Sequence, residues 1–213
     1  MTDNEKNFRQ MLEDILKKLN TVFLSEADFQ FTLAWKIKKG LNGNGEVILE
    51  YPEPIEDENR NVYYDIYVED EKGNKHLIEL KYRTKEATIT RHGIEFKLKN
   101  QSAHDLGRYH FIADIARLEK QKISTGSSYC LMLTNDAAYK AGVTGDTNDR
   151  DFRFGDSIPG DKELDWKDKS KEYCKNLDCI KLKRDYKIEW HDYKLTGNSD
   201  VKFQYLLLEI PNN

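Results

Sequence analysis

Two apolar stretches separated by a charged loop decide the fold: YYDIYV at residues 63–68 and HLIELKY at residues 76–82. Both are rich in aromatic and β-branched residues, which predicts two β-strands joined by a hairpin turn. Side chains alternate between the faces of a strand, so Glu79 and Lys81 point to the same face. If the two strands pair, Asp65 joins Glu79 and Lys81 on one surface, and we expect the rest of the chain to be arranged around that cluster.

The residues before these strands predict two helices and a third strand. Apolar residues recur at helical spacing over residues 8–19, which indicates an amphipathic helix. Ser25 is a suitable N-cap for a second helix, Glu26 to Lys39, with Gly40 as its terminator. A strand is predicted at residues 46–51 and is expected to end at Pro52 and Pro54.

The residues after the strands continue this mixed pattern. We expect residues 83–99 to form an extended arm or a small hairpin, residues 102–122 the longest helix, and the apolar residues 129–134 a buried strand. The order helix, three-stranded meander, helix, strand predicts an α/β fold with a mixed sheet.

The last third of the chain adds a polar segment and further strands. Residues 142–161 are rich in Gly and Asp and predict a long loop, and a weak helix is expected at residues 167–176. Two C-terminal strands are expected at residues 186–193 and 202–210, joined by a turn at Gly197-Asn198.

Length and composition restrict the class of protein. The 213 residues, 38% of them hydrophobic, predict a single domain over residues 1–213. The net charge of −4 argues against a generally basic nucleic-acid coat protein but is compatible with a local basic patch. The three cysteines lack a CxxC pattern, which argues against a zinc site or disulfide scaffold and predicts a cytoplasmic location. The polar first residues and the absence of an apolar run of about 18 residues predict neither a signal peptide nor a membrane span.

The acid-x-Lys tripeptide at Glu79 has a special context. Seven such tripeptides occur, beginning at Asp70, Glu79, Glu95, Asp165, Asp185, Asp192 and Asp200. Only the one at Glu79 has apolar residues on both sides and an acidic strand before it. Carboxylates in a strand interior are costly without a partner, so either a divalent cation or a structural Lys–carboxylate pair is expected. Oxygen ligands of this kind suit Mg²⁺ or Mn²⁺ rather than zinc.

These residues and this element order resemble the PD-(D/E)xK nuclease superfamily, which has the restriction-endonuclease-like fold. The family motif places an Asp on the second core strand and (Asp/Glu)-x-Lys on the third, matching Asp65 and Glu79-Leu80-Lys81. Many members add a Glu from the first core helix, and Glu26 lies in that position. The resemblance covers a core of about residues 20–136, while residues 142–213 match nothing in the superfamily. Tyr64 stands where the family often has the Pro of its name.

The resemblance implies metal-assisted hydrolysis of phosphodiester bonds. Asp65, Glu79 and Glu26, with the Leu80 carbonyl, would hold one or two Mg²⁺ ions that polarise the scissile phosphate and activate a water. Lys81 would orient or deprotonate that water and offset the charge of the transition state. Glu50 on the neighbouring strand is a weaker candidate, since a solvent-facing role explains it equally well.

A local excess of positive charge follows the candidate site. From Lys81 to Lys99 there are six Lys or Arg residues and two Glu. Such a segment is where a phosphate backbone would need positive charge, although a solvated arm explains it equally well. The candidate nucleic-acid-binding residues are Arg83, Lys85, Arg91, Lys97, Lys99 and, at the start of the long helix, Gln101. His104 is expected to cap the helix or face solvent, and the pairs Asp105–Arg108 and Asp114–Arg117 to form ion pairs along it.

Three hypotheses follow from the sequence. The first is a Mg²⁺-dependent nuclease acting on DNA, with RNA not excluded, as a homodimer in which two symmetric sites cut two strands. The second is a catalytically inactive nuclease-fold protein that binds nucleic acid or protein. The presence of Asp65, Glu79, Lys81 and Glu26 together argues against such decay. The third is an ordinary α/β protein in which the cluster is a salt bridge.

Overall fold

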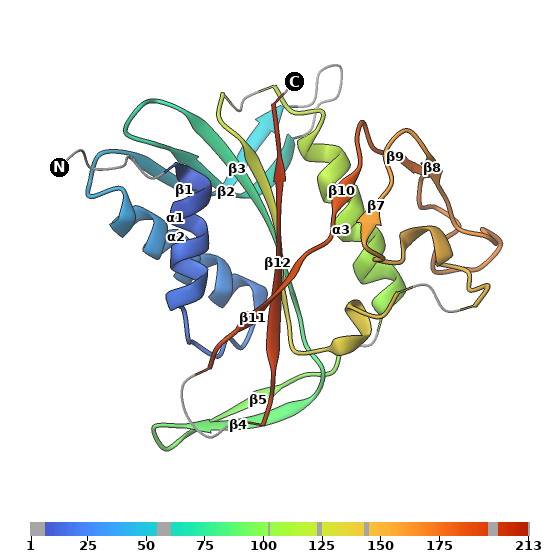
Figure 1. Cartoon of the computed structure of the whole chain (residues 1–213), viewed down its shortest axis with the longest axis horizontal. Coiled ribbons are helices and arrows are strands. Elements are labelled where there is room, and N and C mark those ends of the chain that lie inside the picture. The colour runs from blue at the N-terminus through green and yellow to red at the C-terminus, as the bar shows by residue number, and fades with distance from the viewer. Residues whose placement is uncertain are drawn as a thin grey trace.

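The computed structural model describes residues 7–54, 61–101, 103–122, 125–142, 145–195 and 200–212. A six-stranded mixed sheet lies between two layers of other structure (Figure 1). Helices α1 and α2 cover one face, and helix α3 with the segment that connects β6 to β11 covers the other. The expected mixed α/β class is therefore confirmed.

Three α-helices occur among the described residues: α1 (Phe8–Lys18), α2 (Glu26–Gly40) and α3 (His104–Leu118). Each corresponds to a helix predicted from the sequence, and α3 is shorter at both ends than the predicted 102–122. Ser25 caps α2 as expected, because its hydroxyl accepts a hydrogen bond from the backbone N–H of Asp28 at 3.1 Å. This cap fixes the first turn of α2, which carries Glu26.

The central sheet contains β1 (Glu46–Pro54), β2 (Asn61–Glu69), β3 (Lys75–Arg83), β6 (Ser128–Thr134), β12 (Phe203–Ile210) and β11 (Trp190–Tyr193) in that spatial order. Strands β3 and β6 are parallel, and every other neighbouring pair is antiparallel. The connection between the parallel strands runs through the small hairpin β4 (Ala87–Arg91) and β5 (Ile94–Leu98) and then through α3. The expected meander, helix and further strand are all present.

Alternation along the central strands builds two apolar layers. In β6, Tyr129, Leu131 and Leu133 face the α1–α2 layer, whereas Cys130 and Met132 face α3. The same holds in β3, where Ile78, Leu80 and Tyr82 pack toward α2. The sheet is therefore buried on both faces, and Glu79 and Lys81 point into the α3 layer.

Four sequence predictions outside the core need correction. Strand β1 continues through Pro52 to Pro54, because it is an edge strand whose outer N–H groups need no ladder partner. The predicted strand over 186–193 is split into β10 (Tyr186–Lys187), which pairs with β7 (Ser157–Ile158), and β11, which joins the main sheet.

The other two concern the segment after β6. Residues 167–176 form turns rather than a helix, and the predicted loop of 142–161 contains the 3-10 helix η2 (Arg150–Phe152) and β7. Two further elements, η1 (Ala137–Tyr139) and the pair β8 (Glu163–Leu164) with β9 (Ile180–Lys181), complete this segment. The turn expected at Gly197-Asn198 lies outside the described residues.

Two observations bear on the predicted location. No helix within the described ranges is long and apolar enough to cross a membrane. All three cysteines are free thiols, with Cys130 and Cys174 buried and Cys179 exposed.

Candidate active site

The candidate site lies where strands β2 and β3 part. Their ladder runs from Glu69–Lys75 to Ile66–Ile78 and ends there. Beyond that point two side-chain carboxylates accept the hydrogen bonds of the β3 backbone N–H groups. Asp65 Oδ2 accepts a hydrogen bond from the Leu80 N–H at 2.6 Å. Glu26 Oε2 accepts a hydrogen bond from the Tyr82 N–H at 2.7 Å. Because alternate N–H groups of a strand point to the same edge, these two carboxylates stand in for the missing strand.

A second set of contacts fixes Asp65 from the side of α2. The buried Gln30 amide donates to the Asp65 carbonyl oxygen at 2.7 Å and to Glu50 Oε1 at 2.6 Å. Glu50 lies opposite Asp65 and has a φ of 50°, in the left-handed region that costs a non-glycine residue about 1 kcal/mol or more. Glu50, the weaker sequence candidate, is thus part of the support of Asp65. Gln30 lies one helical turn after Glu26, and the sequence alone indicated no role for it.

Glu79 and Lys81 form a network of ion pairs with α3. Glu79 Oε1 lies 2.6 Å from Arg117 Nη2, and Lys81 Nζ lies 2.5 Å from Asp114 Oδ2. Asp114 Oδ1 also accepts a hydrogen bond from Arg117 at 3.0 Å, the helical pair expected from the sequence. The Glu79 side chain is 2% exposed and that of Lys81 12%, so these charges are almost fully removed from water. Asp114 and Arg117 were not recognised as site residues, because their i, i+3 spacing explained them as a pair of their own.

The electrostatic environment disfavours negative charge at the two strand carboxyls. Burial raises the pKa of Asp65 to about 6, with Glu26 and Asp114 adding to the effect, while the Leu80 N–H and Lys81 oppose it. Burial and then Asp114 raise the pKa of Glu79 well above its ordinary value, against the effect of Arg117. The pKa of each carboxyl is therefore raised because burial outweighs the favourable positive charges of Lys81 and Arg117.

Lys81 shows the opposite behaviour. Burial lowers its pKa, but the carboxylate of Asp114 more than reverses this, and the net pKa is raised. Lys81 Nζ also donates to the Leu80 carbonyl oxygen at 3.0 Å. A lysine held in this way stays protonated at neutral pH and acts as a fixed positive charge.

The oxygen donors of the candidate site match a divalent cation in chemical type but not in arrangement. The side chains of Asp65, Glu79 and Glu26 and the Leu80 carbonyl are hard oxygen donors of the kind that Mg²⁺ prefers. Within the described residues, however, no three acidic, histidine or cysteine side chains are close enough together to hold a metal ion. The chemistry of the donors fits, whereas the expected three-carboxylate cage is not assembled in this conformation.

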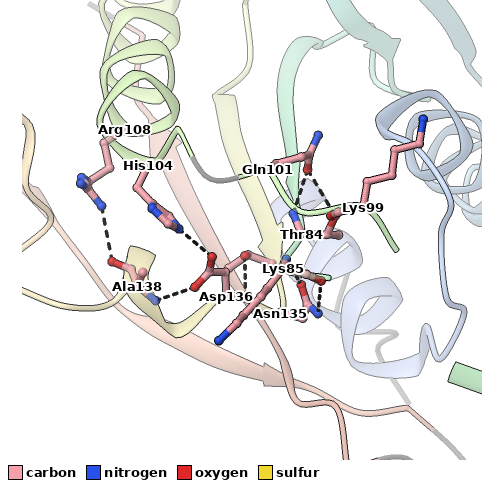
Figure 2. Close-up of polar contacts among 10 residues, drawn as sticks. Thr84, Lys85, Lys99, Gln101, His104, Arg108, Asn135, Asp136 and Ala138 are labelled. Atoms are coloured by element: carbon pink, nitrogen blue, oxygen red, sulfur yellow. Dashed lines mark hydrogen bonds and ion pairs between the residues drawn. The ribbon is translucent and has the colours of Figure 1, made fainter. Parts of the chain in front are cut away.

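The predicted nucleic-acid-binding residues divide into two groups. Three of them serve the local structure. Arg91 donates to the carbonyl oxygen of Asn20, Lys97 pairs with Glu95 at 3.0 Å, and Gln101 Oε1 accepts a hydrogen bond from the Thr84 N–H at 2.8 Å. The second group is Arg83, Lys85 and Lys99. Figure 2 shows the amino groups of Lys85 and Lys99 extending away from the contacts at the ends of β3 and β6.

The same close-up shows the true partner of His104. Its Nε2 lies 2.6 Å from Asp136 Oδ2, just past the end of β6, so the prediction of a helix cap or a surface residue was wrong. Asp136 in turn caps the short helix η1 through the Ala138 N–H at 3.0 Å. These contacts tie the start of α3 to the carboxyl end of β6.

Comparisons with protein-family models, with curated proteins and with solved structures found no match. The site itself consists of two carboxylates on the backbone of β3 and four charges paired between β3 and α3.

Proposed function

We propose that the protein is a Mg²⁺-dependent nuclease that hydrolyses phosphodiester bonds of DNA, with Mn²⁺ able to replace Mg²⁺. The observation that carries the proposal is the fork between β2 and β3. There Glu26 and Asp65 hold the backbone on either side of Lys81, and Glu79 shares the face of that lysine. The element order also supports it, since helix, meander, helix and parallel strand are the core of the PD-(D/E)xK nucleases that the sequence resembles.

The raised pKa values favour a cation at the fork. Asp65 and Glu79 would hold it, with Glu26 and the Leu80 carbonyl beside them. Mg²⁺ often takes one or two protein carboxylates and leaves its other positions to water and substrate phosphate, so a preassembled cage of three acids is not required. When bound, the ion would polarise the scissile phosphate and lower the pKa of a bound water.

The protein's own residues supply charge and position. Because Asp114 keeps Lys81 protonated, Lys81 serves to orient the attacking water and to offset negative charge in the transition state, rather than to take up a proton. Glu26 and Asp65 keep the backbone on both sides of Lys81 in place, which fixes the direction of its side chain. A homodimer with two such sites would account for cutting both strands. The exposed thiol of Cys179 favours a reducing, cytoplasmic location.

A second candidate function is a nucleic-acid or protein-binding module without catalysis. The observation that favours it is the closed set of ion pairs, in which Arg117 neutralises Glu79 and Asp114 neutralises Lys81. In a nuclease, a cation bound by Glu79 has to compete with Arg117. In a binding module these pairs would simply hold α3 on the sheet.

Incubation with nucleic acids separates the two candidates. Supercoiled, linear and single-stranded DNA and RNA are each incubated with Mg²⁺, with Mn²⁺ and with a chelator. A nuclease cuts at least one substrate only with metal, and the Glu79→Gln and Lys81→Ala variants lose roughly a hundredfold or more in rate. The exposed tripeptide beginning at Asp192 on β11 has the same acid-x-Lys spacing, so Asp192→Asn and Lys194→Ala are matched controls that should cut like the parent. No cutting by the parent, or equal cutting by all four variants, would contradict the nuclease proposal.

A further inference from the structure

The charged row on β3 extends one alternate residue past Lys81, to Arg83. Residues 79, 81 and 83 share one face of the strand, and α3 presents His110 on the same helical face as the two residues that pair with Glu79 and Lys81. Glu79 pairs with Arg117, and Lys81, two residues later on β3, pairs with Asp114, three residues earlier on α3. By this register the next helix position, His110, corresponds to Arg83, and the two are close enough for the charge of Arg83 to lower the pKa of His110.

This third position differs from the first two because it contains no acid. Arg83 has no ion pair or side-chain hydrogen bond within the described part of the chain, and its Nε atom is buried without a hydrogen-bond partner. Three other arginines also have a buried Nε atom of this kind, but Arg108, Arg117 and Arg153 each pair with a carboxylate. Arg83 therefore carries a positive charge that no neighbouring carboxylate offsets.

The groups around Arg83 include two donors, His110 and Tyr139. The nearby carboxylates Asp136 and Asp105 form no ion pair with Arg83 within the described residues. Burial lowers the pKa of His110, and Lys81 and Arg83 lower it further, against Asp114. Burial raises the pKa of Tyr139, and Arg83 is the strongest opposing influence there. The Tyr139 hydroxyl is itself buried without a hydrogen-bond partner. His110 is partly removed from water but still exposed, and Arg83 is half-buried, whereas Tyr139 is buried. His110 and Arg83 are therefore the donors that an acceptor from outside can reach.

We propose that Arg83 and His110 form an anion-binding subsite beside Lys81 that takes a phosphate group of the nucleic-acid backbone. The guanidinium group offers two parallel donors that match a phosphate, and the histidine ring offers another. Two residues along a strand are about 6.6 Å apart, which gives this phosphate a place distinct from the one at Lys81. The subsite rests on the proposed function only in that its ligand is the nucleic acid; it needs no hydrolysis.

Binding in a chelator tests the subsite apart from catalysis. The anisotropy of a short, fluorescently labelled DNA duplex is measured at several salt concentrations for the parent, Arg83→Ala and Arg83→Lys. We expect Arg83→Ala to bind about tenfold more weakly, and its slope of log affinity against log salt to fall by about one. Arg83→Lys should keep the salt slope and part of the affinity. The matched control is Arg150→Ala, which removes the same charge from an exposed ion pair with Asp146 and should bind like the parent.

The outcomes are separable from those of the cleavage assay. The inference is overturned if the parent binds no nucleic acid, if Arg83→Ala binds like the parent, or if Arg150→Ala loses as much affinity. If thermal melting shows that Arg83→Ala is not folded, Arg83→Gln, which keeps most of the side chain, is measured in its place. Binding that depends on Arg83 without any cutting would leave the subsite intact and contradict only the nuclease proposal. If Arg83→Ala cuts and binds DNA like the parent, the nuclease proposal stands and the subsite is contradicted.

Discussion

The Asp65→Asn substitution tests whether the ionised carboxylate at the fork makes the free protein less stable. The carboxylate accepts a hydrogen bond from the Leu80 N–H at 2.6 Å, and the amide oxygen of asparagine can accept the same bond. The substitution therefore removes the charge and keeps the contact. It is also expected to abolish cutting, because it removes a proposed metal ligand.

The size of the effect follows from the pKa of Asp65, which burial raises from 3.8 to about 6. Because the folded state holds the proton more tightly than the unfolded chain, ionisation costs stability. The cost is fully present above about pH 6, shrinks as the pH falls, and is absent below 3.8. At about 1.4 kcal/mol for each tenfold change in proton affinity, the cost is roughly 3 kcal/mol at about pH 8 and about half of that at about pH 5.

Thermal or urea unfolding of the parent and the variant between about pH 5 and pH 8 measures this difference. We expect Asp65→Asn to be the more stable protein by roughly 6 to 12 °C in Tm at the upper end, and by less at the lower end. Added Mg²⁺ should stabilise the parent and leave the variant unchanged. The exposed Asp192 provides the control, since Asp192→Asn should change little at any pH. A variant less stable than the parent throughout, or an advantage independent of pH, would refute the reasoning.

Two further substitutions test the packing around α3 and at the far end of the sheet. Asp149→Asn leaves the guanidinium of Arg108, which is 2.6 Å away and 2% exposed, without a charged partner, and should cost roughly 3 kcal/mol in urea unfolding. A stability within about 0.5 kcal/mol of the parent would contradict that. Gly126→Ala places a Cβ atom 2.2 Å from the ring of the buried His76 and should cost about 1–3 kcal/mol, whereas Gly142→Ala, with no atom within 4 Å, should cost much less. Equal melting temperatures of the two glycine variants would rule out the clash.

The core of the fold could be predicted because its patterns are local. The apolar run at 129–134 marked β6 to within one residue, and Ser25 marked the start of α2. The segment from 137 to 193 could not be predicted in the same way. Its strands are two to four residues long and pair across distant sequence, as Ser157–Ile158 does with Tyr186–Lys187. So short an element shows no period, and packing against α3 determines it.

The residues of the candidate site that lie on strands could be predicted from the sequence. Their contacts with the helix packed on the sheet could not. Alternation placed Glu79 and Lys81 on one face, and the resemblance to the PD-(D/E)xK nucleases associated Glu26 with them. Contact of Asp114 and Arg117 with that face could not be predicted, because the register of a helix on a sheet depends on tertiary packing. The helical pairing of these two residues was a sufficient local explanation, and it concealed their second set of partners.

The position of the carboxylates explains how a sheet can keep acids in its interior. Where β2 leaves β3, two N–H groups would be left without acceptors, and such groups are costly when buried. Glu26 and Asp65 supply those acceptors, so the same contacts that complete the sheet also bring two negative charges beside Lys81. The stability gained from the hydrogen bonds offsets part of the cost of burying the charges. The part of the burial cost that is not offset raises the pKa of Asp65. Binding of a cation, as proposed above, would offset this part of the cost.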